Sequence, residues 1–177
     1  PYESSGKGRV IGMELLIRHQ LANNFFGWVS YTLSQARRVD RPGAPERPFN
    51  FDQTHILAIL GSYKLPNNWS IGGRWRYVTG NPNTAVATAV YNEQSDNYTQ
   101  VRSDCTYCSR IPAFHQLDVR VDKTFVFDRF LLGLYVDVQN AYNRANPEGL
   151  QYNFDATQSA VLAGLPLIPS FGIRGEF

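Results

Sequence analysis

The sequence has no long hydrophobic run, few charged residues and very little sulfur. Charged residues make up 18% of the chain, and only two of its 177 residues are cysteine. Every apolar stretch is interrupted by glycine, serine or charge within a few positions, so none approaches the ~20 residues of a membrane-spanning helix. This pattern excludes a helical membrane protein. Because the net charge is only +2 and there is no basic stripe, we expect no nucleic-acid partner.

The start of the chain lacks both a methionine and a leader segment of basic, apolar and small residues. We therefore expect that Pro1 is not the true N-terminus and that the sequence is part of a longer protein. The length allows either one soluble domain or a run of membrane strands, so length alone does not decide between them.

Aromatic residues are what the sequence has in abundance. Ten Tyr, eleven Phe and three Trp occur in a chain that is 43% hydrophobic, yet the mean hydropathy is −0.32. So many rings in a chain that is polar on average indicate apolar residues interleaved with polar ones. The sequence therefore predicts an all-β fold.

Seven stretches of alternating apolar and polar residues are separated by short and long connections in turn, which is typical of successive antiparallel hairpins. The expected strands are 9–19, 25–35, 54–65, 69–79, 114–127, 130–140 and 167–177. Short turns are expected at 22–24, 66–68 and 128–129, and long connections at 36–50, 80–111 and 142–166. In an outer-membrane barrel short turns are periplasmic and long loops extracellular, so the pattern also predicts an orientation.

The parity of each strand separates apolar from polar side chains, because successive residues point to opposite faces of a sheet. One face is predicted to carry apolar residues, among them Leu117, Val119, Val121, Leu132, Leu134 and Val136. The other face is predicted to be the polar, lumen-facing one, with Glu14, Arg18, Arg74, Arg76, Asp118, Arg120, Asp122, Asp137, Arg174 and Glu176. The stretch 54–65 is apolar at both parities, so its orientation stays open.

The placement of the rings favours a membrane over a soluble barrel or sandwich, which would show the same alternation. Many rings adjoin the short turns or the C-terminus: Phe25, Phe26, Tyr63, Trp69, Phe125, Phe127, Phe130 and Phe177. Rings at one level match the interfacial girdle of a membrane barrel. The expected strands, 11 to 14 residues long, are also long enough for the ~9 to 11 residues that a tilted membrane strand needs. We interpret them as antiparallel transmembrane β-barrel strands.

Four short segments resemble TonB-dependent outer-membrane receptors. Residues 170–177 are similar to the terminal strand signal of outer-membrane proteins, with Ser170, Gly172 and a final Phe177, although Gly175 stands where that signal usually has a hydrophobic residue. Residues 138–143 resemble a segment near the end of these receptors, with Ala141 and Tyr142 in place of Leu and Phe. Residues 51–55 and 117–121 are similar to recurring strand starts in the same barrels.

The resemblance implies that residues 1–177 are the C-terminal part of a barrel of 22 strands. About seven strands cannot close an all-antiparallel barrel, because closure requires an even number, so we expect the chain to be a fragment or one member of a larger assembly. The missing parts are the earlier strands and an N-terminal plug, on which an inner-membrane energy-transducing complex acts. The implied function is energised uptake of a scarce nutrient, such as an iron chelate, through the outer membrane of a Gram-negative bacterium. The implied partners also include outer-membrane lipid and the barrel assembly machinery, which recognises the terminal strand. No cofactor is implied.

The candidate sites all have ordinary structural interpretations beside the functional ones. The polar-face charges are nearly balanced in sign, which favours a salt-bridged, hydrated wall; Arg74 and Arg76 would be the best anion contacts on a substrate path. Cys105 and Cys108 favour a small loop disulfide over a metal site, which would need four ligands. His55 and His115 lie at the outer ends of two strands, where polar packing is favoured over metal ligation.

Other functions remain open at this point. A surface barrel that acts as an adhesin or phage receptor, a passive pore, and a soluble ligand-binding barrel would share much of the pattern. No nucleophile with a base, no paired catalytic acids and no phosphate loop can be placed in the sequence, so we do not expect an enzyme.

Overall fold

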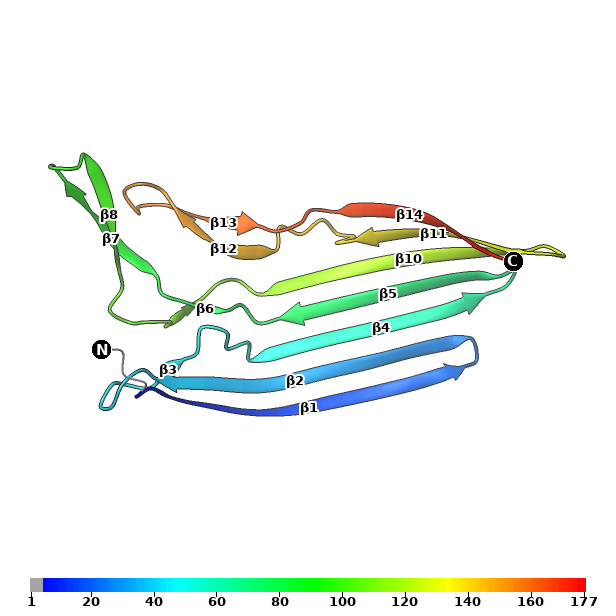
Figure 1. Cartoon of the computed structure of the whole chain (residues 1–177), viewed down its shortest axis with the longest axis horizontal. Helices are drawn as coiled ribbons and strands as arrows, with labels where there is room; N and C mark the ends of the chain where they lie inside the picture. The colour runs from blue at the N-terminus through cyan, green and yellow to red at the C-terminus, as the bar shows by residue number, and fades with distance from the viewer. Residues whose placement is uncertain (1–4) are drawn as a thin grey trace.

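Seven long strands form one antiparallel sheet, and they lie side by side in the order of the sequence (Figure 1). The computed structural model describes residues 5–177, and all the regular secondary structure in that range is β-strand. The long strands are β1(Lys7–Ala22), β2(Phe25–Val39), β4(His55–Leu65), β5(Trp69–Val78), β10(Phe114–Val126), β11(Leu131–Gln139) and β14(Ile168–Glu176). The two-residue β3(Arg47–Pro48) pairs with the end of β2.

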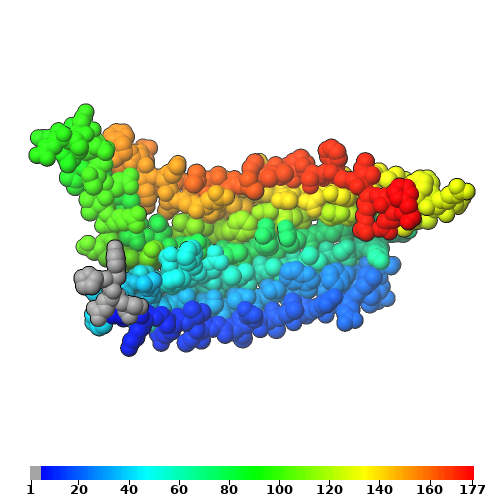
Figure 2. Space-filling view, in the orientation of Figure 1, coloured from blue at the N-terminus to red at the C-terminus, as the bar shows by residue number. Residues whose placement is uncertain are grey.

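The long connections contain short strands of their own, which the sequence did not predict. These are β6(Pro82–Asn83) with β9(Ser109–Arg110), β7(Val86–Asn92) with β8(Asn97–Arg102), and β12(Pro147–Tyr152) with β13(Ser159–Ala163). All of them lie at one end of the sheet, which we call the loop end, and the β7–β8 hairpin projects beyond it (Figures 1 and 2). The opposite end, with the three tight turns and the C-terminus, we call the short-turn end.

Asparagine pairs make two of the tight turns possible. Asn23 and Asn24 have φ of 49° and 64°, and Asn67 and Asn68 both have φ of 58°. Two consecutive positive φ values define a type I′ turn, and asparagine tolerates this region better than other residues with a side chain. Because type I′ turns match the twist of the flanking strands, they join β1 to β2 and β4 to β5 directly.

The strand register gives the sheet one polar and one apolar face. Leu60, Arg74 and Asp118 lie in one row across β4, β5 and β10, and the row beside it holds Ile59, Trp75 and Leu117. Residues that share a face therefore continue from strand to strand. For the stretch whose orientation the sequence left open, this register places Leu57, Ile59, Tyr63 and Leu65 on the apolar face and Ile56, Ala58, Leu60, Ser62 and Lys64 on the polar face.

Burial is the reverse of that in an ordinary soluble domain. No hydrophobic side chain is buried among the described residues, whereas five polar ones are: Asp52, Thr84, Asp118, Asn140 and Asn146. Large apolar side chains are open to the surroundings instead, with Phe171 86% and Ile173 74% exposed. The seven long strands form a single sheet, and the exposure of its large apolar side chains means that nothing in the described chain covers the apolar face.

The sheet is open at both edges within residues 5–177. Every residue of β1 is exposed, and neither β1 nor β14 has a further strand on its outer side. Such edges present rows of unpaired backbone N–H and C=O groups. The described residues contain no helix long and apolar enough to cross a membrane.

The seven expected strands correspond to the seven long strands of the sheet, in order and in antiparallel pairing. The bounds of the last five agree within one residue. The expected strands 9–19 and 25–35 are shorter than β1 and β2. The two observed strands continue to pair as far as Lys7 and Val39, and the end of β2 also pairs with β3. Phe127 and Phe177, which we assigned to strands, lie just past the ends of β10 and β14.

Candidate functional site

Several hydrogen bonds converge on Asp118, which is buried on the polar face. Arg74 donates to its Oδ2 through Nη2 at 2.7 Å and through Nε at 3.1 Å. The backbone N–H of Asn140 donates to Oδ1 at 3.1 Å, and Gln116 donates to the same oxygen. A buried carboxylate is stable only when hydrogen bonds and a counter-charge replace its water. Asp118 has both, so it joins β5, β10 and the end of β11.

A second group of polar contacts lies on β10, β11 and β14. The guanidinium of Arg120 donates to Asp122 at 2.7 Å and stacks 4.0 Å above the ring centroid of Tyr135. The ring of Tyr135 in turn lies against Gly172, where an added Cβ would come within 2.3 Å of the ring. A glycine is therefore required at position 172 for this ring to lie flat on β14.

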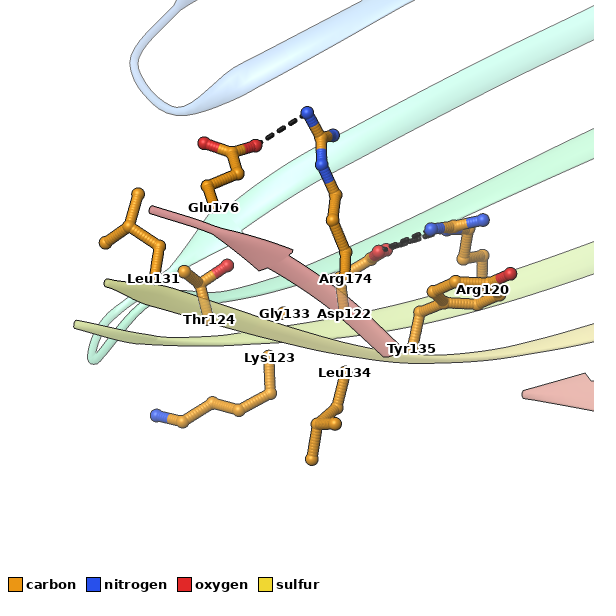
Figure 3. Close-up of a pocket in the computed structure, with 10 residues that line it drawn as sticks. All are labelled: Arg120, Asp122, Lys123, Thr124, Leu131, Gly133, Leu134, Tyr135, Arg174 and Glu176. Atoms are coloured by element: carbon orange, nitrogen blue, oxygen red, sulfur yellow. Dashed lines mark hydrogen bonds and ion pairs between the residues drawn. The ribbon is translucent and has the colours of Figure 1, made fainter. Parts of the chain in front are cut away.

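A hollow of about 190 Å³ adjoins this group near the short-turn end (Figure 3). Arg174 and Glu176 form an ion pair of 2.6 Å on the same side as Arg120. Lys123 and Leu134 point to the opposite side of the sheet. A larger hollow, of about 420 Å³, runs along the polar face. Its lining includes Ser62, Arg74, Asp118, Arg120, Asp122, Asp137 and Gln139.

The remaining polar-face candidates do not lie together in one site. Arg18 stacks over Phe26 at 5.5 Å, and Arg76 over Phe114 at the same distance. Glu14 lies on β1 opposite Thr32. The candidates thus form several local contacts along the face, three of which are ion pairs, and no single cluster.

Arg110 and Asp52 form a partly buried ion pair that the sequence analysis did not single out. Asp52 is 3% exposed, pairs with Arg110, and accepts the N–H of Ala36 at 2.6 Å. Arg110 also donates to the carbonyl oxygen of Gly80 at 3.0 Å and to Thr54 Oγ1 at 3.2 Å. The pair thereby ties the β2–β4 loop to the β5–β10 connection.

Two buried asparagines order the connection from β11 to β14. The side-chain amide of Asn140 donates to the carbonyl oxygens of Arg144 and Leu165 at 2.9 and 3.1 Å, and its Oδ1 accepts the N–H of Arg144 at 3.0 Å. Asn146 Oδ1 accepts the N–H of His115 at 3.0 Å. Because Asn140 has φ of 52°, it also turns the chain away from β11.

Both histidines that we considered as metal ligands form hydrogen bonds with tyrosines. His55 Nδ1 lies 2.8 Å from Tyr31 Oη, and His115 Nδ1 lies 2.7 Å from Tyr142 Oη. No group of three His, Cys, Asp or Glu side chains within residues 5–177 is arranged to hold a metal ion.

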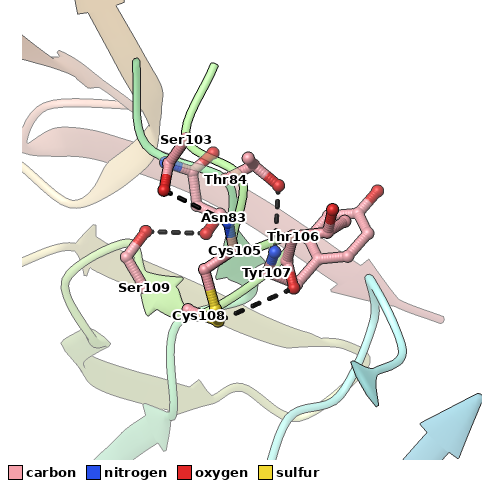
Figure 4. Close-up of a disulfide and its surroundings, with 8 residues drawn as sticks. All are labelled: Asn83, Thr84, Ser103, Cys105, Thr106, Tyr107, Cys108 and Ser109. Carbon is pink, nitrogen blue, oxygen red and sulfur yellow. Dashed lines mark hydrogen bonds between the residues drawn. A yellow bond between two sulfur atoms is a disulfide. The ribbon is translucent and has the colours of Figure 1, made fainter. Parts of the chain in front are cut away.

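Cys105 and Cys108 are joined in a disulfide at the loop end (Figure 4). The bridge closes a tight loop in which Tyr107 has φ of 59°. The N–H of Tyr107 donates to the buried Thr84 Oγ1 at 2.9 Å, and its ring faces the guanidinium of Arg47 at 4.7 Å. The disulfide loop is therefore fixed against the β2–β4 loop.

Two groups of aromatic side chains lie towards opposite ends of the long strands. At the short-turn end the rings of Phe127 and Phe130 stack 4.5 Å apart, and Phe177 follows at 6.1 Å. Towards the loop end Trp75 lies 6.2 Å from Tyr77 and 6.5 Å from His115. We predicted the first group from the sequence but not the second.

Comparisons of the chain with protein families, with curated protein sequences and with solved structures find no match.

Proposed function

We propose that this chain is part of a transmembrane β-barrel of the bacterial outer membrane, of the TonB-dependent receptor type. Its function would be energised uptake of a scarce nutrient, such as an iron chelate, and not catalysis. The observation that carries the proposal is the reversed burial, in which the hydrophobic side chains are exposed and the buried ones are polar. Such a sheet is stable where lipid covers its apolar face and water its polar face.

The spacing of the two aromatic groups supports a membrane. On β10, His115 of the loop-end group and Phe125, one of the rings that the sequence analysis placed beside the short turns, lie ten residues apart. Ten residues span about 33 Å along a strand, which is about 25 Å across the bilayer at a tilt of about 40°. The apolar band of an outer-membrane barrel has this height, with aromatic rings at both borders.

Lys123 supports the same placement, because it is a cation on the apolar face that lies at a border. Its Nζ donates to the carbonyl oxygen of Asn67 in the tight turn and lies 5.2 Å from the ring centroids of both Trp69 and Phe125. A lysine near the end of a membrane strand extends its charged group towards the headgroups while its methylene chain stays in the apolar layer.

The open edges imply further strands. In lipid, an unpaired backbone group costs several kcal/mol, so β1 and β14 must each pair with another strand. We propose that these strands belong to the rest of the barrel, in the same or another chain. The resemblance of residues 138–143 and 170–177 to TonB-dependent receptors supports a plug inside the barrel, an inner-membrane energy-transducing complex and the barrel assembly machinery as partners.

The test has two stages in the source bacterium. First, the full-length protein should fractionate with the outer membrane and run faster on gels before heating than after it. Second, deleting its gene should slow growth in iron-limited medium, and deleting the energy-transducing complex should add no further defect. A cytoplasmic fraction would contradict the membrane proposal. Outer-membrane location without a plug-like segment in the gene would contradict energised uptake alone.

The loop end favours an adhesin as a second candidate function. The rings of Tyr98 and Phe154 meet edge to face at 5.3 Å between the β7–β8 and β12–β13 hairpins, and Phe154 is 69% exposed. Exposed aromatic groups of this kind are common in contacts with other macromolecules. Loss of cell adhesion, with unchanged growth on limiting iron, would favour this alternative.

A further inference from the structure

A cleft of about 800 Å³ at the loop end separates the β2–β4 loop from the disulfide loop. One wall comes from residues 37–48 and the other from residues 104–110. The walls are held together by the stacking of Arg47 on Tyr107, and the second wall is anchored by the pairing of Arg110 with buried Asp52. Two segments far apart in the sequence thus form a cavity of defined shape.

Four of the seven charged residues that line this cleft are arginines. The charged residues of the lining are Arg37, Asp40, Arg41, Glu46, Arg47, Asp104 and Arg110. Asp40 accepts two hydrogen bonds from Arg47, at 2.6 and 2.7 Å, and forms a third contact with Arg38 at 3.0 Å. The Arg47 guanidinium holds the pKa of Asp40 below its usual range, so this carboxylate stays occupied by its partners.

The remaining charges leave a surplus of guanidinium. Glu46 is paired with Arg9 at 3.0 Å. No described ion pair includes Arg37 or Arg41, and Asp104 is the one carboxylate of the lining that is likewise outside the described pairs. Two guanidiniums against one carboxylate make the cleft attractive to anions.

We propose that this cleft binds a small soluble polyanion carrying carboxylate or phosphate groups, with Arg37 and Arg41 as its main contacts. The planar guanidinium fork matches two oxygens of a carboxylate or phosphate at once, and such charge-assisted bonds are the stronger ones in proteins. The inference rests on the proposed function in that it names the class of nutrient taken up.

The test measures binding to the full-length protein in neutral detergent by titration calorimetry. Citrate serves as the carboxylate probe and pyrophosphate as the phosphate probe, and vesicles of phosphatidylglycerol test a lipid source of the same chemistry. Arg37→Gln together with Arg41→Gln should weaken binding of a soluble anion by about tenfold or more. The matched control is Arg129→Gln, in the exposed turn at the short-turn end, which should bind like the wild type.

Two further measurements distinguish the loss of the guanidinium fork from a loss of charge and from misfolding. Arg37→Lys with Arg41→Lys keeps the charge but loses the fork, so its affinity should fall between those of the wild type and the Gln variant. Circular dichroism must show that all variants fold alike. Absence of binding to both soluble anions, equal binding by the Gln variant, or binding to vesicles alone would overturn the proposal. Cell fractionation judges the membrane location separately, so a failure there leaves the cleft result interpretable.

Discussion

Val136 is the position at which the environment of the apolar face can be tested most sharply. It lies in the middle of the apolar band, beside Val121 on β10 and Phe171 on β14, and 52% of it is exposed. Arginine at an exposed strand position in water would change the free energy of unfolding by at most about 0.5 kcal/mol. At the middle of a bilayer the same change should cost about 2 to 4 kcal/mol. That cost lowers the ratio of folded to unfolded protein by about 30-fold to about 900-fold.

The assay is unfolding of the full-length protein in lipid vesicles by denaturant, followed by heat-modifiable mobility. The matched control is Gln139→Arg, on the polar face of the same strand and beside Asp118 and Asp137 in the larger hollow. We expect Val136→Arg to move the unfolding midpoint strongly and Gln139→Arg to move it little. Equal effects of the two substitutions, or no effect of the first, would refute the assignment of the faces.

Three further predictions concern the ends of the strands. Deleting Phe177 should reduce the amount of folded protein in the outer membrane, without changing ligand affinity per folded molecule, because the ring lies at the short-turn end. Replacing Cys105 and Cys108 with serine should leave the sheet folded, since a disulfide that closes so short a loop removes little unfolded-state entropy. Thiol labelling of the unreduced wild-type protein should fail. Pepsin cleavage of the β2–β4 loop in the wild type, measured relative to cleavage of the Asp40→Asn variant at the same pH, should rise only below about pH 4. The hydrogen bonds from Arg47 lower the pKa of Asp40, so the carboxylate stays ionised and its contact with Arg47 stays intact above that pH.

Most of the fold could be predicted from the alternation of apolar and polar side chains. Strands with a period of two residues and type I′ asparagine turns need only local information, so β4, β5, β10 and β11 were predictable to within a residue. The meeting of Arg74 with Asp118 also follows from parity once β5 and β10 are neighbours. That neighbourhood depends on the long connection between them, and the sequence does not specify its path.

The contacts at the loop end could not be predicted, because they join residues far apart in the chain. Arg110 reaches Asp52 across two connections, and neither residue stands in an alternating pattern. The β7–β8 hairpin was missed for a different reason. Its strands are short, β7 being mostly apolar and β8 mostly polar, and neither shows the period-two alternation that marks the long strands. A short resemblance at residues 51–55 marked Asp52 without revealing its partner.

The most direct measurement of the central claim is the environment of each residue of β11 in the membrane. Nitroxide labels placed singly at residues 131–139 of the full-length protein in lipid vesicles would report collisions with oxygen, which concentrates in lipid, and with a water-soluble nickel chelate. We predict that oxygen collisions peak at Leu132, Leu134, Val136 and Val138, and that nickel collisions peak at the residues between them. Uniform access of the nickel chelate to both sets would contradict a transmembrane strand.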